Sequence, residues 1–105
     1  MHIFRVSFVF NGKVYEVYAE TVRQAELFGF IEIADLVFGE NSSVVVDPGE
    51  ERLKAEFSGV SRTLVPMNAV LRIDEVEKRG PSKISDLEIT SNVTPFPSPF
   101  FVPRR

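Results

Sequence analysis

The sequence predicts an α+β protein with one strongly curved antiparallel sheet, or a small, partly open barrel. Three observations predict it: an alternating apolar run with an Asn-Gly turn opens the chain, a fully capped helix begins after Asp47, and two apolar runs flank Pro66. The elements follow in the order β-β-(α)-β-β-α-β-β over about eighty residues, with connections short enough for antiparallel neighbours. A body of this size has one modest core, so we expect self-association into a homo-oligomer.

The first two strands form a hairpin in this interpretation. Phenylalanine or valine occupies every second position from Phe4 to Phe10, which is the period of a strand with one buried face. Asn11-Gly12 follows, and both residues tolerate the positive φ of a type I′ turn. Pairing across this turn places Phe8 opposite Tyr15, Val6 opposite Val17 and Phe4 opposite Ala19.

The segment after the hairpin leaves two interpretations open. Thr21 and Gln24 have the spacing of a capping box and predict a helical turn, which Gly29 then interrupts. Residues 30–38 fit either one face of a helix or a strand buried on both sides. We prefer the strand, paired with Val44-Val45-Val46 as a second hairpin, because aromatic and β-branched residues are enriched in both runs.

The helix in the middle of the chain carries signals at both of its ends. Asp47 is suited to cap the first turn, Pro48 fits the first helical position, and Glu50 stands three residues after the cap. Gly59 can adopt the left-handed conformation that ends a helix. We therefore expect a helix from about Pro48 to Phe57.

This helix needs a surface to pack against, because a helix of roughly ten residues is marginal alone in water. Leu53 and Phe57 lie four residues apart on one face and should pack on the sheet. Residues 61–65 and 69–76 predict two further strands. Pro66-Met67-Asn68 separates them and should form a tight turn.

The composition changes near Gly80, which leads us to expect a single domain at residues 1–80 and a flexible, Pro/Phe-rich tail at residues 81–105. Five of the seven prolines of the chain follow position 80, and they favour polyproline II over a sheet. Within the tail, Ile84 could begin one more extended piece. Because exposed aromatic rings are costly in water, the tail is interpreted as docking on a partner or a second copy, or as an extension that is dispensable or folds back. The residues that would bind are Phe96, Phe100 and Phe101.

Composition limits the compartment and the partner. The chain has no cysteine, no secretory signal pattern and no apolar run long enough to span a membrane, so we expect a cytoplasmic protein. Residues 1–80 hold nine Lys/Arg and thirteen Asp/Glu, a net charge of −4 that argues against a general nucleic-acid binder. A local anion or RNA patch of Arg52, Arg62 and Arg72 is one interpretation, and three solvated arginines paired with nearby acids is the other.

Groups suited to catalysis are sparse in the sequence. His2 is the single histidine and has no cysteine beside it, so we expect no metal site and no cofactor. The acidic pair Glu50-Glu51 serves the helix start, and Asp74-Glu75 alternates along a strand. The glycines are scattered singly and form no phosphate-binding loop. We therefore expect a protein that is not an enzyme.

Five segments of the chain resemble the small bacterial proteins grouped as domain of unknown function 1820: HIFRVSF, NGKVYEVYA, FGFIEIADLVFGE, VVVDPGEERLKAEFSGV and LVPMNAVLRIDEV. This resemblance covers about residues 1–80, implies a bacterial cytoplasmic protein, and transfers no activity, ligand or catalytic residue. A weaker likeness is to SH3-like and Sm-like small barrels, in which two closing strands flank a tight turn as Thr63 to Ile73 do here. We expect a binding or regulatory module acting through protein–protein contacts, with Sm-like RNA binding as the alternative.

Overall fold

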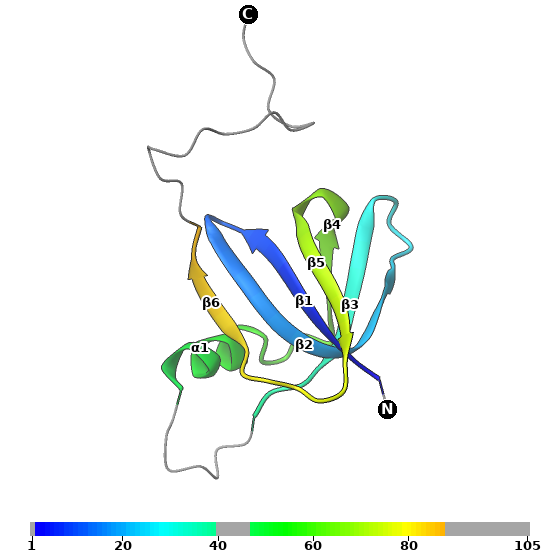
Figure 1. Ribbon diagram of the computed structural model, residues 1–105. Coiled ribbons are helices and arrows are strands. Elements are labelled where there is room, and N and C mark those ends of the chain that lie inside the picture. Colours follow the sequence, from blue (N-terminus) through cyan, green and yellow to red (C-terminus); the bar gives the residue numbers. More distant parts are fainter. Residues whose placement is uncertain (1, 40–46, 88–105) are drawn as a thin grey trace, which may run out of the picture.

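The computed structural model describes residues 2–39 and 47–87 and contains one antiparallel sheet and one helix (Figure 1). The strands pair in the order β4-β3-β2-β1-β5, and β6 pairs with β2. The α+β class and the single small antiparallel sheet are therefore confirmed, and the sheet is open. The elements are β1 (Ile3–Phe10), β2 (Lys13–Gln24), β3 (Phe30–Leu36), α1 (Pro48–Glu56), β4 (Arg62–Pro66), the 3₁₀ turn η1 (Met67–Ala69), β5 (Val70–Val76) and β6 (Lys83–Asp86).

The β1–β2 hairpin has the register that the sequence predicted. Asn11 and Gly12 form its turn with φ angles of 57° and 75°, the positive values that a type I′ turn requires. All three predicted pairs are present: Phe8 with Tyr15, Val6 with Val17 and Phe4 with Ala19.

Strand β2 continues where we expected a helical turn, so that prediction is wrong. Thr21 and Gln24 both pair with β3, and the strand ends only at Gln24. The Thr21 hydroxyl donates a hydrogen bond of 2.8 Å to Asp35 instead of capping a helix. The capping-box spacing was a local signal that pairing with a neighbouring strand overrode.

The strand interpretation of residues 30–38 is confirmed by β3, which ends at Leu36. Its proposed partner, Val44-Val45-Val46, lies outside the described residues. Strand β3 is instead flanked by β2 on one side and by β4 on the other. The pairing of β3 with β4, a strand from beyond the helix, was not predicted.

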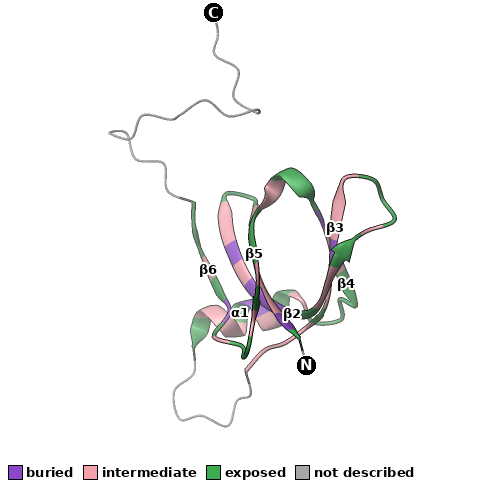
Figure 2. Cartoon of the chain, turned by 45° about the vertical axis from the view of Figure 1, so that its right-hand side comes forward, coloured by how far each residue is buried: buried purple, intermediate pink, exposed green. Residues whose placement is uncertain are grey.

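Helix α1 has the predicted start and stop. The Asp47 carboxylate accepts hydrogen bonds from the backbone N–H groups of Gly49 and Glu50, and Gly59 has a φ of +81° just past the end of the helix. Leu53 is fully buried against the sheet. Figure 2 shows the buried residues gathered along the strands near α1, and the largest fully buried apolar side chains are Val6, Val17, Ile33 and Leu53.

Strands β4 and β5 are consecutive in the chain but lie at opposite ends of the strand order, so the expectation that they are antiparallel neighbours is wrong. The turn between them is present as η1, whose three residues join the two ends of the sheet. In a flat sheet four strand spacings of about 4.8 Å would separate these ends by about 19 Å, whereas the Pro66-to-Val70 link spans at most about 14 Å. The sheet must therefore curve strongly, which confirms that part of the prediction.

Strand β6 extends the folded body beyond residue 80, where we placed the end of the domain. Lys83–Asp86 pairs with the first residues of β2, and Ser82 is buried. A Cβ on Gly80 would lie 2.8 Å from the Tyr18 hydroxyl, so this glycine allows the chain to pass close to β2. The described chain ends at Leu87, whose N–H donates to the Gly12 carbonyl at the hairpin turn.

Candidate functional site

An aromatic pocket opens between the β1–β2 hairpin, the end of α1 and strand β4. Its volume is about 280 Å³. It is lined by Phe8, Phe10 and Tyr15 of the hairpin, by Phe57 after α1, and by residues 63–66 of β4. We call this site the aromatic pocket. It lies just below the range of pockets that bury drug-sized ligands, so it has room for one or two side chains of a ligand.

Tyr15 is the centre of the aromatic side chains of the pocket. Its ring stacks on Phe8 with 5.0 Å between ring centroids and meets Phe10 and Phe57 edge-on at 6.1 and 6.4 Å. Cross-strand pairing fixes the first contact, because Phe8 and Tyr15 face each other in the hairpin. Phe10, at the rim, remains 58% exposed. The pocket therefore has an aromatic floor and one exposed apolar ring available to a ligand.

A single hydrogen bond ties the pocket to the helix. The Tyr15 hydroxyl donates to the Glu56 carboxylate at 2.9 Å. Burial raises the pKa of the Tyr15 phenol, and the neighbouring Glu56 carboxylate raises it further. The phenol therefore stays protonated at neutral pH and keeps the end of α1 in place.

One edge of β4 faces away from β3, beside the pocket. The Met67 N–H donates to the carbonyl of Gly29, the residue opposite it, at 2.8 Å. Hydrogen-bonded pairs alternate along an antiparallel ladder, so Thr63 and Val65 also bond to β3. Leu64, between them, points its N–H and C=O away from β3. No strand among residues 2–39 and 47–87 pairs with that outer edge. Pro66, also on that edge, has no N–H to offer. Leu64 thus presents one donor and one acceptor next to the pocket.

This arrangement suits an extended peptide better than an ion or a charged cofactor. The pocket walls are apolar apart from Glu56, Thr63 and the Tyr15 hydroxyl, so they favour apolar side chains. The outer edge of β4 can hydrogen-bond to a backbone that lies alongside it. Within residues 2–39 and 47–87, no three His, Asp or Glu side chains converge as a metal site would require, and no helix is long and apolar enough to cross a membrane.

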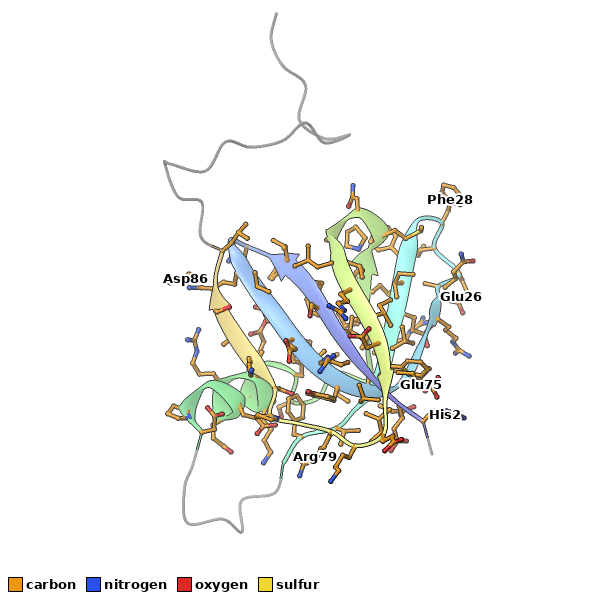
Figure 3. The ribbon with its side chains drawn as sticks, viewed as in Figure 1. His2, Glu26, Phe28, Glu75, Arg79 and Asp86 are labelled. Carbon is orange, nitrogen blue, oxygen red and sulfur yellow. The ribbon has the colours of Figure 1, made fainter. Side chains whose placement is uncertain are left out.

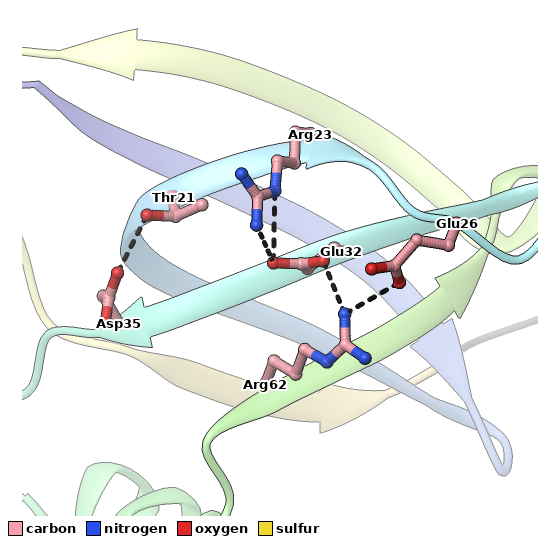
Figure 4. Close-up of polar contacts among 6 residues, drawn as sticks. All are labelled: Thr21, Arg23, Glu26, Glu32, Asp35 and Arg62. Carbon is pink, nitrogen blue, oxygen red and sulfur yellow. Dashed lines mark hydrogen bonds and ion pairs between the residues drawn. The ribbon is translucent and has the colours of Figure 1, made fainter.

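The three arginines predicted as an anion or RNA patch are distributed over α1, β4 and β5. Arg62 binds two carboxylates, at 2.8 Å from Glu32 and 3.1 Å from Glu26 (Figure 4). Arg72 lies 2.9 Å from Asp74. Arg52 is exposed on α1, and β4 and β5 lie at opposite ends of the strand order.

The buried carboxylate of Glu32 explains why Arg62 is occupied. Glu32 is 3% exposed and also lies 3.1 Å from Arg23 on β2, so two guanidinium groups neutralise it. The hydrogen bond from Arg62 lowers the pKa of Glu26. This network joins β2, β3 and β4, so Arg23 and Arg62 are paired with carboxylates within the fold.

The acidic pairs and the histidine have structural partners. One Glu50 oxygen accepts hydrogen bonds from the N–H groups of Gly39 and Ser82, so this residue joins three segments rather than completing a capping box. Arg5 and Arg72 hold Asp74 and lower the pKa of its carboxyl group. His2 is exposed and bonds to Glu75, and Figure 3 shows the two side chains together at the start of the chain.

A second apolar surface lies at the β2–β3 turn. Phe28 is fully exposed at its tip and projects into solvent (Figure 3). Leu27 and Met67 are also more than half exposed. Phe28 and Met67 line a separate, more polar depression with Gln24 and Glu26. This depression has a smaller volume of about 180 Å³ and a more polar lining than the aromatic pocket, which makes it the weaker candidate and a useful control.

Sequence reasoning placed the residues of the aromatic pocket in the core and missed the pocket itself. Phe8 and Tyr15 were predicted to pair, and Phe57 was predicted to dock, but nothing local indicated that β4 would lie across from them. The available signal was the presence of four aromatic side chains on elements predicted to pack together: Phe8, Phe10, Tyr15 and Phe57. The tail residues Phe96, Phe100 and Phe101 lie outside the described residues.

Comparison with known proteins agrees with the resemblance stated from the sequence. A model of the family described as "Domain of unknown function (DUF1820)" matches residues 2–98. The match extends past residue 80, where we took the resemblance to end, and includes the first part of the tail. No curated protein and no solved structure gives a match. The chain therefore belongs to the DUF1820 family.

Proposed function

We propose that this protein is a non-enzymatic binding module, and that its aromatic pocket receives aromatic or proline side chains from an extended peptide segment of a partner protein. The observation that carries the proposal is the position of an apolar pocket beside the outer edge of β4, which pairs with no other strand of the described residues. Backbone hydrogen bonds to Leu64 would supply affinity whatever the peptide sequence. The pocket would select the side chains that face it.

The shape of the sheet supports this proposal. A five-strand path whose ends are joined by the three residues of η1 is in line with a partly open barrel of the SH3-like kind. SH3 domains bind proline-rich segments in aromatic-lined grooves, using the extended conformation that proline already favours. The likeness to SH3 domains concerns the fold, and the aromatic pocket is what supports binding. We place the binding in the bacterial cytoplasm, in line with the cysteine-free sequence.

RNA binding is disfavoured by the charges near the pocket. RNA-binding surfaces combine stacking rings with a basic groove that follows the phosphates. The charged side chain that lines the pocket is an acid, Glu56, which accepts a hydrogen bond from the Tyr15 hydroxyl. The guanidinium of Arg62, on the strand that forms the far wall, is held by carboxylates.

The test is a titration of the full chain with a synthetic peptide, Ac-Pro-Phe-Pro-Ser-Pro-Phe-NH2, called the Pro-Phe peptide. Phe10→Glu places a charge on the pocket rim, and Phe28→Glu makes the same change on the second apolar surface. Both rings are largely exposed, so both variants should fold. We expect Phe10→Glu to weaken binding by about tenfold or more and Phe28→Glu to leave it within about twofold.

Two results would overturn the proposal. One is the reverse pattern, in which only Phe28→Glu weakens binding of the peptide. The other is tight binding of an oligouridine that weakens steeply with added salt and is insensitive to Phe10→Glu, since this would assign the protein to RNA.

A further inference from the structure

The described chain ends beside the aromatic pocket. Strand β6 pairs with the start of β2, placing Asp86 next to Lys13, and the Leu87 N–H donates to the Gly12 carbonyl at 3.0 Å. Gly12 belongs to the same hairpin turn that follows Phe10, the exposed ring at the pocket rim. The chain therefore leaves the sheet at the hairpin that forms one wall of the pocket.

The chain beyond this point is long enough to reach the pocket. Residues 88–94 carry no proline and precede Pro95-Phe96-Pro97. A seven-residue link has a root-mean-square span of about 15 Å and a fully extended span of about 24 Å. Either length reaches the pocket, because Phe10 and Tyr15 lie within three residues of the hairpin turn, which is about 10 Å along a strand.

The chemistry of the segment matches that of the pocket. Phe96 lies between two prolines in the sequence, and proline favours an extended backbone, which lowers the entropy lost on binding. No charge lies between Glu88 and Arg104, so the segment can enter an apolar site without desolvating an ion. The family match runs to residue 98, so it includes Pro95-Phe96-Pro97 and stops short of Phe100 and Phe101.

From these observations we infer that the aromatic pocket is occupied by Phe96 of the same chain, so that a partner peptide must displace it. This inference rests on the proposed function, since it names the occupant of the same pocket. Tethering favours the intramolecular complex, because a short flexible linker provides an effective concentration in the millimolar range. The tail would then tune the affinity of the pocket for any partner.

The test uses the full chain with methyl-labelled leucines and protonated phenylalanine rings in a deuterated background. We expect nuclear Overhauser effects between the Phe96 ring and the Leu64 methyl groups, and a shift of the Leu64 signals in Phe96→Ala. Phe100→Ala is the matched control and should leave the Leu64 signals in place. The methyl signals of Leu71 on β5 should not shift in either variant. A sample that mixes labelled and unlabelled chains separates contacts within one chain from contacts between copies.

A second readout is the affinity for the Pro-Phe peptide. Removing the internal competitor should tighten peptide binding to Phe96→Ala by about fivefold or more, because affinity scales with the fraction of open pocket. Unchanged Leu64 signals and unchanged affinity, or contacts only between copies, would overturn the inference. If the peptide still shifts the Leu64 methyl groups of Phe96→Ala, the proposed function survives that failure. If it does not, both fail.

Discussion

Replacing Leu53 by alanine tests whether α1 is held on the sheet by its apolar face. Leu53 is fully buried, and the change removes three carbon atoms from that environment. At about 0.8 kcal/mol per buried methylene the lost transfer free energy is about 2.4 kcal/mol. The cavity left behind adds to this, so we expect a loss of about 3 kcal/mol in the free energy of unfolding.

Urea denaturation followed by far-ultraviolet circular dichroism measures this loss. With a slope of about 1–3 kcal/mol per molar urea, the midpoint should fall by about 1–3 M. Val60→Ala is the matched control, because Val60 follows the same helix and is 41% exposed. We expect that variant to lose less than about 0.5 kcal/mol.

The result for Leu53→Ala also bears on the pocket, since α1 carries Glu56 and leads into Phe57. If the loss is below about 1 kcal/mol, or equal to that of Val60→Ala, the helix is not docked and the pocket has no wall on that side. Such a result would show that α1 does not position Glu56 and Phe57 at the pocket.

Three further outcomes are expected. Tyr15→Phe should lose about 1 kcal/mol of stability, because it removes the hydrogen bond to Glu56 while the exposed carboxylate regains water. In the unsubstituted chain, an absorbance titration should show the raised pKa of Tyr15 as ionisation above the ordinary range of tyrosine. Stability should fall as the pH rises past the unfolded-state pKa of tyrosine, near 10. Stability should also fall in acid: the pKa values of Glu26, Asp74 and Asp86 are lowered by hydrogen bonds to Arg62, Arg5 and Lys13, so the unfolded chain binds protons first, and the stabilisation present above about pH 4.5 is lost as the pH falls through the lowered values. A midpoint of urea unfolding that does not change between pH 7 and pH 3 would contradict this. Leu64→Pro should lower the free energy of unfolding less than Thr63→Pro does, by about 1 kcal/mol or more, because of these two residues only Thr63 bonds its N–H to β3. Equal losses would show that the ladder has the opposite phase.

The expected self-association stays a prediction. Size-exclusion chromatography with light scattering on the full chain gives its molar mass directly. Phe10→Glu and Phe28→Glu, measured in the same way, would show whether either apolar surface joins the copies.

Elements whose signals are local could be predicted from the sequence. The Asn11-Gly12 turn fixes the hairpin register, since a shift of one residue would turn Val6 and Val17 out of the core. Asp47 and Gly59 mark the helix in the same way, because caps act on the nearest backbone groups. In both cases the residues that determine the register or the bounds lie within a few positions of the element itself.

Elements whose partners are distant in sequence could not be predicted. Thr21 and Gln24 match a capping box as well as a strand, and only the presence of β3 alongside decides for the strand. The separation of β4 from β5 depends on the curvature of the whole sheet, which no local pattern encodes. The aromatic pocket inherits this limit, because its wall at Leu64 exists only once β4 has paired with β3.

The predicted arginine patch illustrates the same limit for charges. The sequence shows Arg62 without showing that Glu32 will be buried within 2.8 Å of it. A buried carboxylate requires a partner, and its position is known only from the packed strands. An arginine on a predicted strand is therefore a weak indication of an anion site until the nearby acids are located.

Photo-crosslinking shows directly where a peptide binds on this protein. The Pro-Phe peptide, synthesised with benzoylphenylalanine in place of its first phenylalanine, is photo-crosslinked to the full chain carrying Phe96→Ala, and the modified residues are identified by mass spectrometry. We expect crosslinks to Phe57 and Leu64, which both line the aromatic pocket. Crosslinks confined to Leu27 and Phe28, or spread over the surface without preference, would contradict this expectation.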